Sequence, residues 1–316
     1  MSNGTLWSAN AKVAENMGDA TGMPQPHRGS SRTAEFVALF RALESRLSAD
    51  QRLFDDPYAH AFLGTRLRAV LALARVPVTG RLVIEAIDRG WPGARVSVVV
   101  RTRFIDDALK EALADGIDQV AIIGSGFDTR PYRVPGAERA QIFEIDTPGT
   151  LHRKRTRIEA LLGQLPPHVS TVATDFERKD LVAALSRTDF RREAPTLFIW
   201  EGVTSYLSAA AVDATLRRLA TLAARRSQLV FTYLDHATLE GRSELPGART
   251  AIATVRYAGE PFRFGFDPAE LPAYLNRRGF KLLNDLTSVD LAARYLHPLG
   301  RRPIATRFYH VALATR

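Results

Sequence analysis

Five short apolar segments recur through the middle of the chain, and they restrict its possible folds more than any other feature. They cover residues 119–124, 140–146, 170–175, 196–202 and 228–234. Stretches with helical periodicity separate them, most clearly residues 147–163 and 208–226. Strands that alternate with helices form right-handed βαβ units around a parallel sheet buried on both faces. The sequence therefore predicts a doubly wound α/β fold.

The segments before the sheet are expected to belong to the same domain, which we place at residues 30–316. Three blocks with helical periodicity precede the first apolar segment, at residues 33–47, 64–90 and 98–116. They fall within residues 30–116, which we expect to form a helical cap and helices that contact a cofactor. Residues 117–316 would then hold the core of the sheet.

The ends of the chain and one internal region depart from the regular alternation. Residues 1–29 are polar, have glycine and proline near their end, and are expected to form a mobile arm. Residues 235–278 are a looser insertion after the fifth apolar segment. Residues 279–286 and 305–315 form a last apolar pair, joined by a long loop, that could close the sheet as a hairpin.

Composition restricts the partners and the compartment. The 316 residues contain no cysteine, which excludes disulfides and thiolate metal sites, and the seven histidines lack metal-ligand spacing. No apolar run approaches the roughly 20 residues that cross a bilayer, and a secretory signal is not evident, so we expect a cytoplasmic protein. The net charge of +9 comes from scattered arginines without interleaved aromatics. We therefore expect a small-molecule partner, with no nucleic acid, no membrane and no metal.

An expected strand runs directly into a glycine turn in VAIIGSGFDTR, residues 120–130. Ligands of doubly wound sheets lie beyond the carboxyl ends of the strands, so this turn is the candidate cradle. Gly124 permits the tight turn, and Gly126 lets a ligand approach the backbone. Two glycines are a weak signal, because an ordinary strand-to-helix turn also explains them. The third glycine of a dinucleotide-binding fingerprint is absent, and Asp128 follows instead.

Acidic residues end the next three expected strands. Glu144 and Asp146 come about twenty residues after the glycines, where an acid accepts hydrogen bonds from ribose hydroxyls, and they share one face of their strand. Asp175 and Phe176 end the third strand, and a carboxylate beside an aromatic ring suits an adenine. Glu201 ends the fourth strand. This pattern predicts a purine-nucleoside site.

Asp128 helps to distinguish between nucleoside ligands. Acids that line the pocket would repel a pyrophosphate, for which dinucleotide sites present open backbone and a helix N-terminus. S-adenosylmethionine fits better, because it joins a nucleoside to a sulfonium and an α-ammonium and has no phosphate. The alternatives are an NAD(P)-dependent oxidoreductase, a nucleic-acid-binding protein and an RNA methyltransferase, although no appended RNA-binding module is evident.

Several long motifs, in order along the chain, resemble the leucine carboxyl methyltransferase family. They are RTRFIDDAL, VAIIGSGFDTRPYR, FEIDTP, VATDF and WEGVTSYLSAAAVD, which lie between residues 101 and 213. The family consists of class I S-adenosylmethionine-dependent methyltransferases and includes many bacterial small-molecule O-methyltransferases. The resemblance implies a mostly parallel, seven-stranded Rossmann-like sheet under a helical cap, and an O-methyltransferase of secondary metabolism.

The resemblance also assigns cofactor contacts by position. It implies that Arg101 pairs with the methionine carboxylate and that the two glycines line the methionine–ribose side. Asp146 would bind the ribose hydroxyls, and Asp175 with Phe176 would hold the adenine. Glu201 would lie near the methionine ammonium or the sulfonium.

The methyl acceptor is less well defined. The resemblance places Tyr206 near the transferred methyl, with Arg41 as a further basic contact from the cap. A carboxylate acceptor is already ionised at neutral pH and needs no base, and Tyr206 or Arg133 could hold it. A hydroxyl acceptor needs a base, for which His236 is the candidate after the fifth strand, whereas His310 is expected to be structural. We expect a carboxylate, with a hydroxyl as the alternative.

Overall fold

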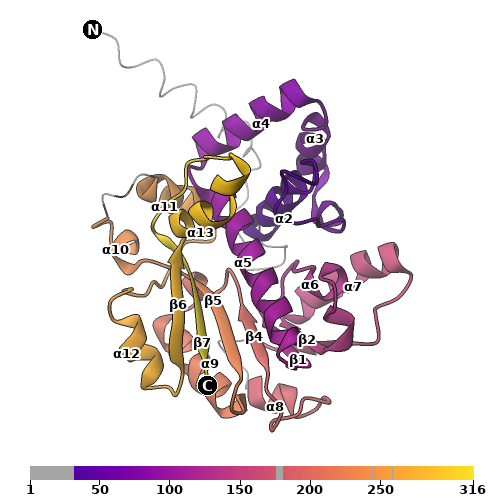
Figure 1. Cartoon of the computed structure of the whole chain (residues 1–316), viewed down its shortest axis with the longest axis vertical. Helices are drawn as coiled ribbons and strands as arrows, with labels where there is room; N and C mark the ends of the chain where they lie inside the picture. Colours follow the sequence, from indigo (N-terminus) through magenta and orange to yellow (C-terminus); the bar gives the residue numbers. More distant parts are fainter. Residues whose placement is uncertain (1–31, 176–180, 244, 246, 258) are drawn as a thin grey trace.

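A seven-stranded sheet forms the centre of the computed structural model, which describes residues 32–175, 181–243, 245, 247–257 and 259–316 (Figure 1). The strand order is β3-β2-β1-β4-β5-β7-β6. The strands are β1 (Gln119–Ile123), β2 (Gln141–Asp146), β3 (Val169–Ala173), β4 (Leu197–Trp200), β5 (Gln228–Leu234), β6 (Lys281–Thr287) and β7 (Tyr309–Thr315). The first five run parallel, and β7 is antiparallel to both β5 and β6. The predicted doubly wound, mostly parallel sheet is confirmed.

Both faces of the sheet are covered, which explains the continuous apolar runs. All residues of β1 and β4 are buried, and their side chains alternate between two cores. One core packs the sheet against α5 (Ala94–Ala114) and α13 (Ser288–Tyr295). The other packs it against helices on the opposite face, which are α8 (Leu181–Leu185), α9 (Ala209–Leu222) and α12 (Leu271–Asn276).

The cap consists of α2 (Arg32–Glu44), η1 (Ala59–Phe62), α3 (Thr65–Leu73) and α4 (Pro77–Gly90), which pack around a third core. The helical block expected over residues 64–90 is two helices rather than one. Pro77 occupies the first turn of α4, and the preceding Val76 is extended, as residues before proline usually are. The chain therefore turns between α3 and α4, and the two helices project at the top of the molecule in Figure 1.

The C-terminal pair of strands is antiparallel as expected, but the connection is not a simple loop. Between β6 and β7 lie α13 and η4 (His297–Leu299). A capping box at Thr287 and Asp290 begins α13 directly after β6, so the connection packs onto the sheet.

The insertion after β5 contains α10 (His236–Leu239) and α11 (Ala248–Tyr257) and then returns across the end of the sheet. The return is anchored by a hydrogen bond from the Phe266 amide to the Leu234 carbonyl at 3.0 Å. Gly265 permits this approach, because a Cβ there would lie 2.7 Å from the Leu234 oxygen. The return places residues 259–263 over the carboxyl ends of β4 and β5.

None of the helices in the described part of the chain combines the length and the apolar character that crossing a bilayer requires.

Candidate active site

A cavity of about 630 Å³ opens at the carboxyl ends of the parallel strands. Its floor comes from the loops after β1, β2 and β4, and its roof from the cap helix α2, the start of α5 and residues 259–263. Parallel strands of a doubly wound sheet place their ligand at this edge. Of the predicted site residues, those that line the cavity are Arg41, Arg101, Gly124, Gly126, Asp128, Asp146, Glu201 and Tyr206.

The glycine turn is fastened to Asp146. The Gly126 amide donates to Asp146 Oδ2 at 2.8 Å, and the Thr147 amide donates to Oδ1 at 2.6 Å. Gly124 has φ of +68°, and a Cβ there would lie 2.4 Å from Val203 Cγ2. Glycine is therefore required at this position for both backbone and space. The carboxylate that was predicted to bind ribose thus also holds the turn in place.

Glu144 is buried and does not line the cavity that Asp146 borders. Its carboxylate forms an ion pair with Lys154 at 2.7 Å, and both side chains are 1 % exposed. Burial raises the pKa of Glu144, which Lys154 opposes. Lys154 also donates to the Ser125 carbonyl at 3.3 Å. Glu144 is not among the described residues that line the cavity, and its contacts support the turn from below.

Two arginines neutralise the acids on the β1 and β4 side. Glu201 binds Arg101 at 2.8 Å and Arg130 at 2.7 Å, and Arg130 also binds Asp128 at 2.6 Å. Burial opposes ionisation of Asp128, but Arg130, Lys154 and Arg41 outweigh it and lower its pKa to about 2. Burial likewise opposes ionisation of Glu201, and Arg130 and Arg101 lower its pKa.

These pairs correct the interpretation of the site as a bare acidic rim. Asp128 and Glu201 are ionised, but each faces at least one cation, so repulsion by uncompensated acids does not exclude pyrophosphate. A different feature disfavours a dinucleotide. The glycine turn leads into α6 (Arg130–Arg133), which has only four residues, rather than into the long helix whose N-terminus receives a pyrophosphate.

Arg130 is a central residue that the sequence reasoning missed. Its side chain is 1 % exposed, and in addition to Asp128 and Glu201 it binds Asp106 at 2.8 Å. Burial opposes its charge, but the three carboxylates raise its pKa well above the usual value. The signal was present in the motif FDTR, where an arginine follows the unexpected Asp128 at a spacing of two residues.

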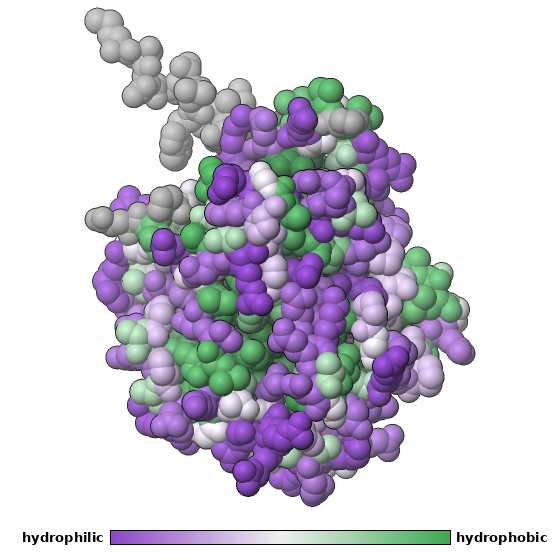
Figure 2. Space-filling model, in the orientation of Figure 1, coloured by the Kyte–Doolittle hydropathy of each residue, from purple (hydrophilic) through white to green (hydrophobic). Residues whose placement is uncertain are grey.

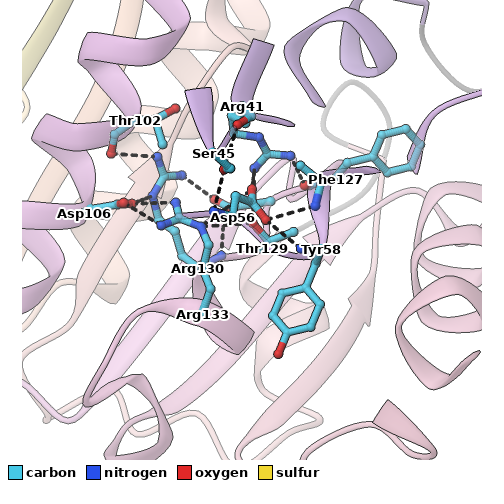
Figure 3. Close-up of polar contacts among 12 residues, drawn as sticks. Arg41, Ser45, Asp56, Tyr58, Thr102, Asp106, Phe127, Thr129, Arg130 and Arg133 are labelled. Carbon is cyan, nitrogen blue, oxygen red and sulfur yellow. Dashed lines mark hydrogen bonds and ion pairs between the residues drawn. The ribbon is translucent and has the colours of Figure 1, made fainter. Parts of the chain in front are cut away.

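A second buried group joins the cap to the glycine turn (Figure 3). Arg41 donates to the Phe127 carbonyl at 2.6 Å and lies 3.5 Å from Asp56, which accepts from Thr129. Arg133 is held by Asp106 at 2.6 Å and lies outside the lining of the cavity. The expectation that Arg133 could hold an acceptor carboxylate is therefore corrected, because its guanidinium is occupied within the protein.

Tyr206 lines the cavity at the end of η3 (Thr204–Tyr206), directly beyond β4, and its place near the transferred methyl stays a prediction. Its ring packs against Phe262 from the returning segment, with 5.4 Å between centroids. Burial raises the pKa of Tyr206 to about 12, so its hydroxyl is protonated at neutral pH and can donate a hydrogen bond.

His236 does not lie where it was expected. It begins α10, its Nε2 lies 3.1 Å from Glu240, and its side chain is 43 % exposed. The expectation that it faces the pocket is corrected, because the Asp235 cap starts α10 at once and directs the imidazole along the surface of that helix. His310 instead borders the cavity. Its Nδ1 lies 3.1 Å from both Asp285 and the Tyr233 hydroxyl.

The adenine side of the site is described only in part. Asp175 is half-buried beyond β3 and is not among the described residues that line the cavity. Phe176 lies outside the described residues. The adenine contacts therefore stay predictions.

The roof of the cavity is aromatic. Phe36 and Phe40 of α2 pack edge-on against Trp91, with centroids 5.7 Å and 6.2 Å from that ring. Tyr309 of β7 adds a further aromatic wall. The cavity thus has a polar end at the loops after β1 and β2 and a mainly apolar end below the cap, which Glu260 and Arg263 also line.

Sequence comparison agrees with this geometry. The family model for leucine carboxyl methyltransferase matches residues 34–220. The chain belongs to the leucine carboxyl methyltransferase family. A Mycolicibacterium gilvum protein, inferred to be an S-adenosyl-L-methionine-dependent methyltransferase, is 32 % identical over 84 % of this chain and 89 % of its own length. A Frankia alni protein of the same inferred activity is 34 % identical over 84 % and 87 %.

Solved structures share the fold at low sequence identity. A protein from Thermobifida fusca, inferred to be a methyltransferase, superimposes with a TM-score of 0.57 and 17 % identity, and covers 94 % of this chain and 99 % of its own. A DUF574 family protein from Streptomyces avermitilis gives a TM-score of 0.56 at 15 % identity, with 91 % and 98 % covered. At these identities the similarity establishes the architecture alone.

Proposed function

We propose that this protein transfers a methyl group from S-adenosylmethionine to the carboxylate of a small, mainly apolar acid and so forms a methyl ester. Methyl transfer that depends on S-adenosylmethionine follows from membership of the family. The acceptor is inferred from the apolar end of the cavity. The observation that carries this inference is the protonated hydroxyl of Tyr206, which lines the cavity.

The residues at the polar end fit the cofactor. Asp146 presents a carboxylate to the cavity beside the open backbone of Gly126, as a ribose requires. The Ser125 hydroxyl is buried without a hydrogen-bond partner among the described residues. Arg101 and Glu201 supply one cation and one anion for the carboxylate and ammonium of the methionine end. When bound, S-adenosylmethionine supplies a methyl group that its sulfonium has already activated.

The part of the cavity around Tyr206 favours an acceptor group that is ionised at neutral pH without a general base. Tyr206 is a poor base, because its pKa is raised to about 12, but its protonated hydroxyl can donate to a carboxylate oxygen. A carboxylate has lost its proton at neutral pH, so the protein needs only to align it and to exclude water. The aromatic walls at Phe40, Trp91 and Phe262 favour an apolar or aromatic body for the acid.

The experiment is a mass-spectrometric screen of paired acceptors. Purified full-length protein and S-adenosylmethionine are incubated with aromatic and aliphatic acids, each matched by the alcohol or phenol of the same skeleton. The proposal expects a product heavier by one methylene from an acid, and mild base should release the acid again. Methylation of the alcohols or phenols but not of the acids would refute the carboxylate acceptor.

One observation favours a hydroxyl acceptor as the second candidate. His310 borders the cavity with its Nδ1 near Asp285, an arrangement that orients an imidazole as a general base. If the acceptor is a hydroxyl, the screen should yield ethers that are stable to mild base. His310→Gln should then abolish turnover, while Kd for S-adenosylmethionine stays unchanged. Under the carboxylate proposal, His310→Gln should leave ester formation within a few-fold of the original protein.

A further inference from the structure

Exposed aliphatic side chains gather at one place on the surface, the turn between α3 and α4. Leu73, Val76, Val78 and Leu82 are 55–69 % exposed, and they make up half of the large exposed apolar side chains among the described residues. Figure 2 shows this apolar area at the top of the molecule, over α3 and α4, with hydrophilic residues around it. We refer to these four side chains as the apolar tip.

The apolar tip is attached to the folded cap. The inner faces of α3 and α4 pack into the core of the cap through residues such as Leu71 and Ile87. The turn itself is closed by the Thr79 hydroxyl, which donates to the Leu73 carbonyl at 2.5 Å. The two helices meet closely at Gly80, where a Cβ would lie 3.0 Å from the Ala74 oxygen. The apolar side chains are therefore presented outward by a folded element.

Four exposed arginines lie on α3 and α4 or in the turn between them, with Arg75 and Arg81 next to the apolar tip in the sequence. Arg66, Arg68, Arg75 and Arg81 are all exposed. None of the four forms an ion pair with a carboxylate of the described residues, in contrast to Arg89, which pairs with Glu85 at 2.9 Å. Aliphatic side chains flanked by such cations are the composition that binds an anionic membrane surface.

We propose that the apolar tip docks this protein onto the surface of an anionic lipid bilayer. The four aliphatic side chains enter the boundary between headgroups and acyl chains, and the four arginines contact lipid phosphates. The expectation of no membrane partner rested on the absence of a spanning segment, and docking of this kind requires none.

Charge and composition favour a bilayer over other occupants. Residues 65–90 contain no aromatic side chain, whereas surfaces that bind single-stranded nucleic acid use aromatic stacking platforms beside their cations. A second copy of the chain would bring two sets of unpaired arginines together at one symmetric interface, where like charges repel. A phospholipid surface complements both the aliphatic and the cationic part.

Docking would also orient the cavity. Helix α4 runs from the apolar tip to Gly90, and Trp91, which follows, lines the cavity. Fourteen helical residues span about 21 Å. Trp91, at the apolar end of the cavity, would then lie within about one helix length of the lipid.

The test is co-sedimentation of the full-length protein with vesicles of equal parts phosphatidylglycerol and phosphatidylcholine, and with phosphatidylcholine alone. We expect binding to the anionic vesicles that weakens with salt. The double variant Val78→Asp/Leu82→Asp should lower the partition coefficient at least about ten-fold. Arg75→Gln/Arg81→Gln should lower it about thirty-fold, since each cation near a charged membrane contributes roughly five-fold.

The matched control is Leu161→Asp/Leu283→Asp, which places the same two charges at leucines that are 42 % and 48 % exposed outside the apolar tip. It should bind vesicles like the original protein, and circular dichroism should show that all variants are folded. Absence of binding to anionic vesicles, or an equal loss in Leu161→Asp/Leu283→Asp, would overturn the proposal. A dimer in light scattering that Val78→Asp/Leu82→Asp converts to a monomer would also overturn it, in favour of a second copy.

Discussion

Replacement of Asp146 by alanine is the most direct test of the polar end of the cavity. The carboxylate borders the cavity and accepts hydrogen bonds from two backbone N–H groups, Gly126 at 2.8 Å and Thr147 at 2.6 Å, which leaves acceptor capacity for a ligand. The substitution therefore removes the proposed ribose contacts and also releases the glycine turn. Both effects act on the affinity for S-adenosylmethionine.

The expected magnitude follows from these contacts. A hydrogen bond to a charged group contributes about 1.5–3 kcal/mol, and two ribose hydroxyls would form two such bonds. Water replaces part of this loss, so we expect Asp146→Ala to weaken binding by about 3 kcal/mol, or roughly 150-fold in Kd. Asp146→Asn retains one acceptor oxygen but presents an amide N–H₂ to one of the two backbone donors. Its Kd for S-adenosylmethionine should therefore lie between those of the original protein and of Asp146→Ala.

Isothermal titration calorimetry with S-adenosylmethionine and with S-adenosylhomocysteine measures both affinities. The control is Asp189→Ala, an exposed acid that precedes β4 at the opposite end of the sheet and should leave Kd unchanged. Thermal melting without ligand separates loss of affinity from loss of folding. Unaltered affinity in a folded Asp146→Ala protein would refute the placement of the ribose at this carboxylate.

Three further predictions concern stability. Arg130→Met leaves three buried carboxylates without their shared cation and should lower the free energy of unfolding in urea by about 3–5 kcal/mol, whereas Arg139→Met at a surface position should change it by less than about 0.5 kcal/mol. Gly124→Ala should lower the free energy of unfolding by about 1–3 kcal/mol, because φ is +68° and the new Cβ meets Val203. Adding Val203→Ala to this variant should remove the steric clash but not the strain of the positive φ. The pKa of Asp128 is lowered from 3.8 to about 2 in the folded protein, so its ionisation contributes about 2 kcal/mol of stability above pH 4, which is lost as the pH falls through 2. When the free energy of unfolding is measured against pH, Asp128→Asn should therefore reduce its slope in the acid range. An unchanged slope would contradict this assignment.

The sheet could be predicted from the sequence because burial on both faces leaves an uninterrupted apolar run. The fifth run, at residues 228–234, coincides with β5. The ends of helices that depend on local backbone conformation were harder to predict from the sequence. The division of residues 64–90 into two helices depends on how the chain turns before Pro77, and the helix between β6 and β7 depends on a capping box. The periodicity of apolar residues indicates neither of these two features.

The candidate site was predictable where strand ends alone define it. Asp146 ends β2 and Glu201 directly follows β4, so their position at the cavity follows from topology. The pairing of side chains was not predictable, because it depends on elements far apart in the chain. Glu144 was expected to share the site of Asp146, but Lys154 of α7 (Pro148–Leu162) binds it beneath the glycine turn. His236 follows a strand as the acids do, but the cap of α10 turns it to the surface.

The buried charges explain how a glycine-rich turn can be preorganised for its ligand. Arg130 binds Glu201 beyond β4, Asp128 in the turn and Asp106 on α5, so one guanidinium joins three elements that meet beside the cavity. Asp106 also binds Arg133, and the Arg41 contact with the Phe127 carbonyl joins the turn to the cap. Because moving Arg130 would leave Asp128 without an ion-pair partner, and moving a carboxylate would remove one of the partners of the buried Arg130, the turn is restrained before a ligand arrives, and less ordering is required on binding.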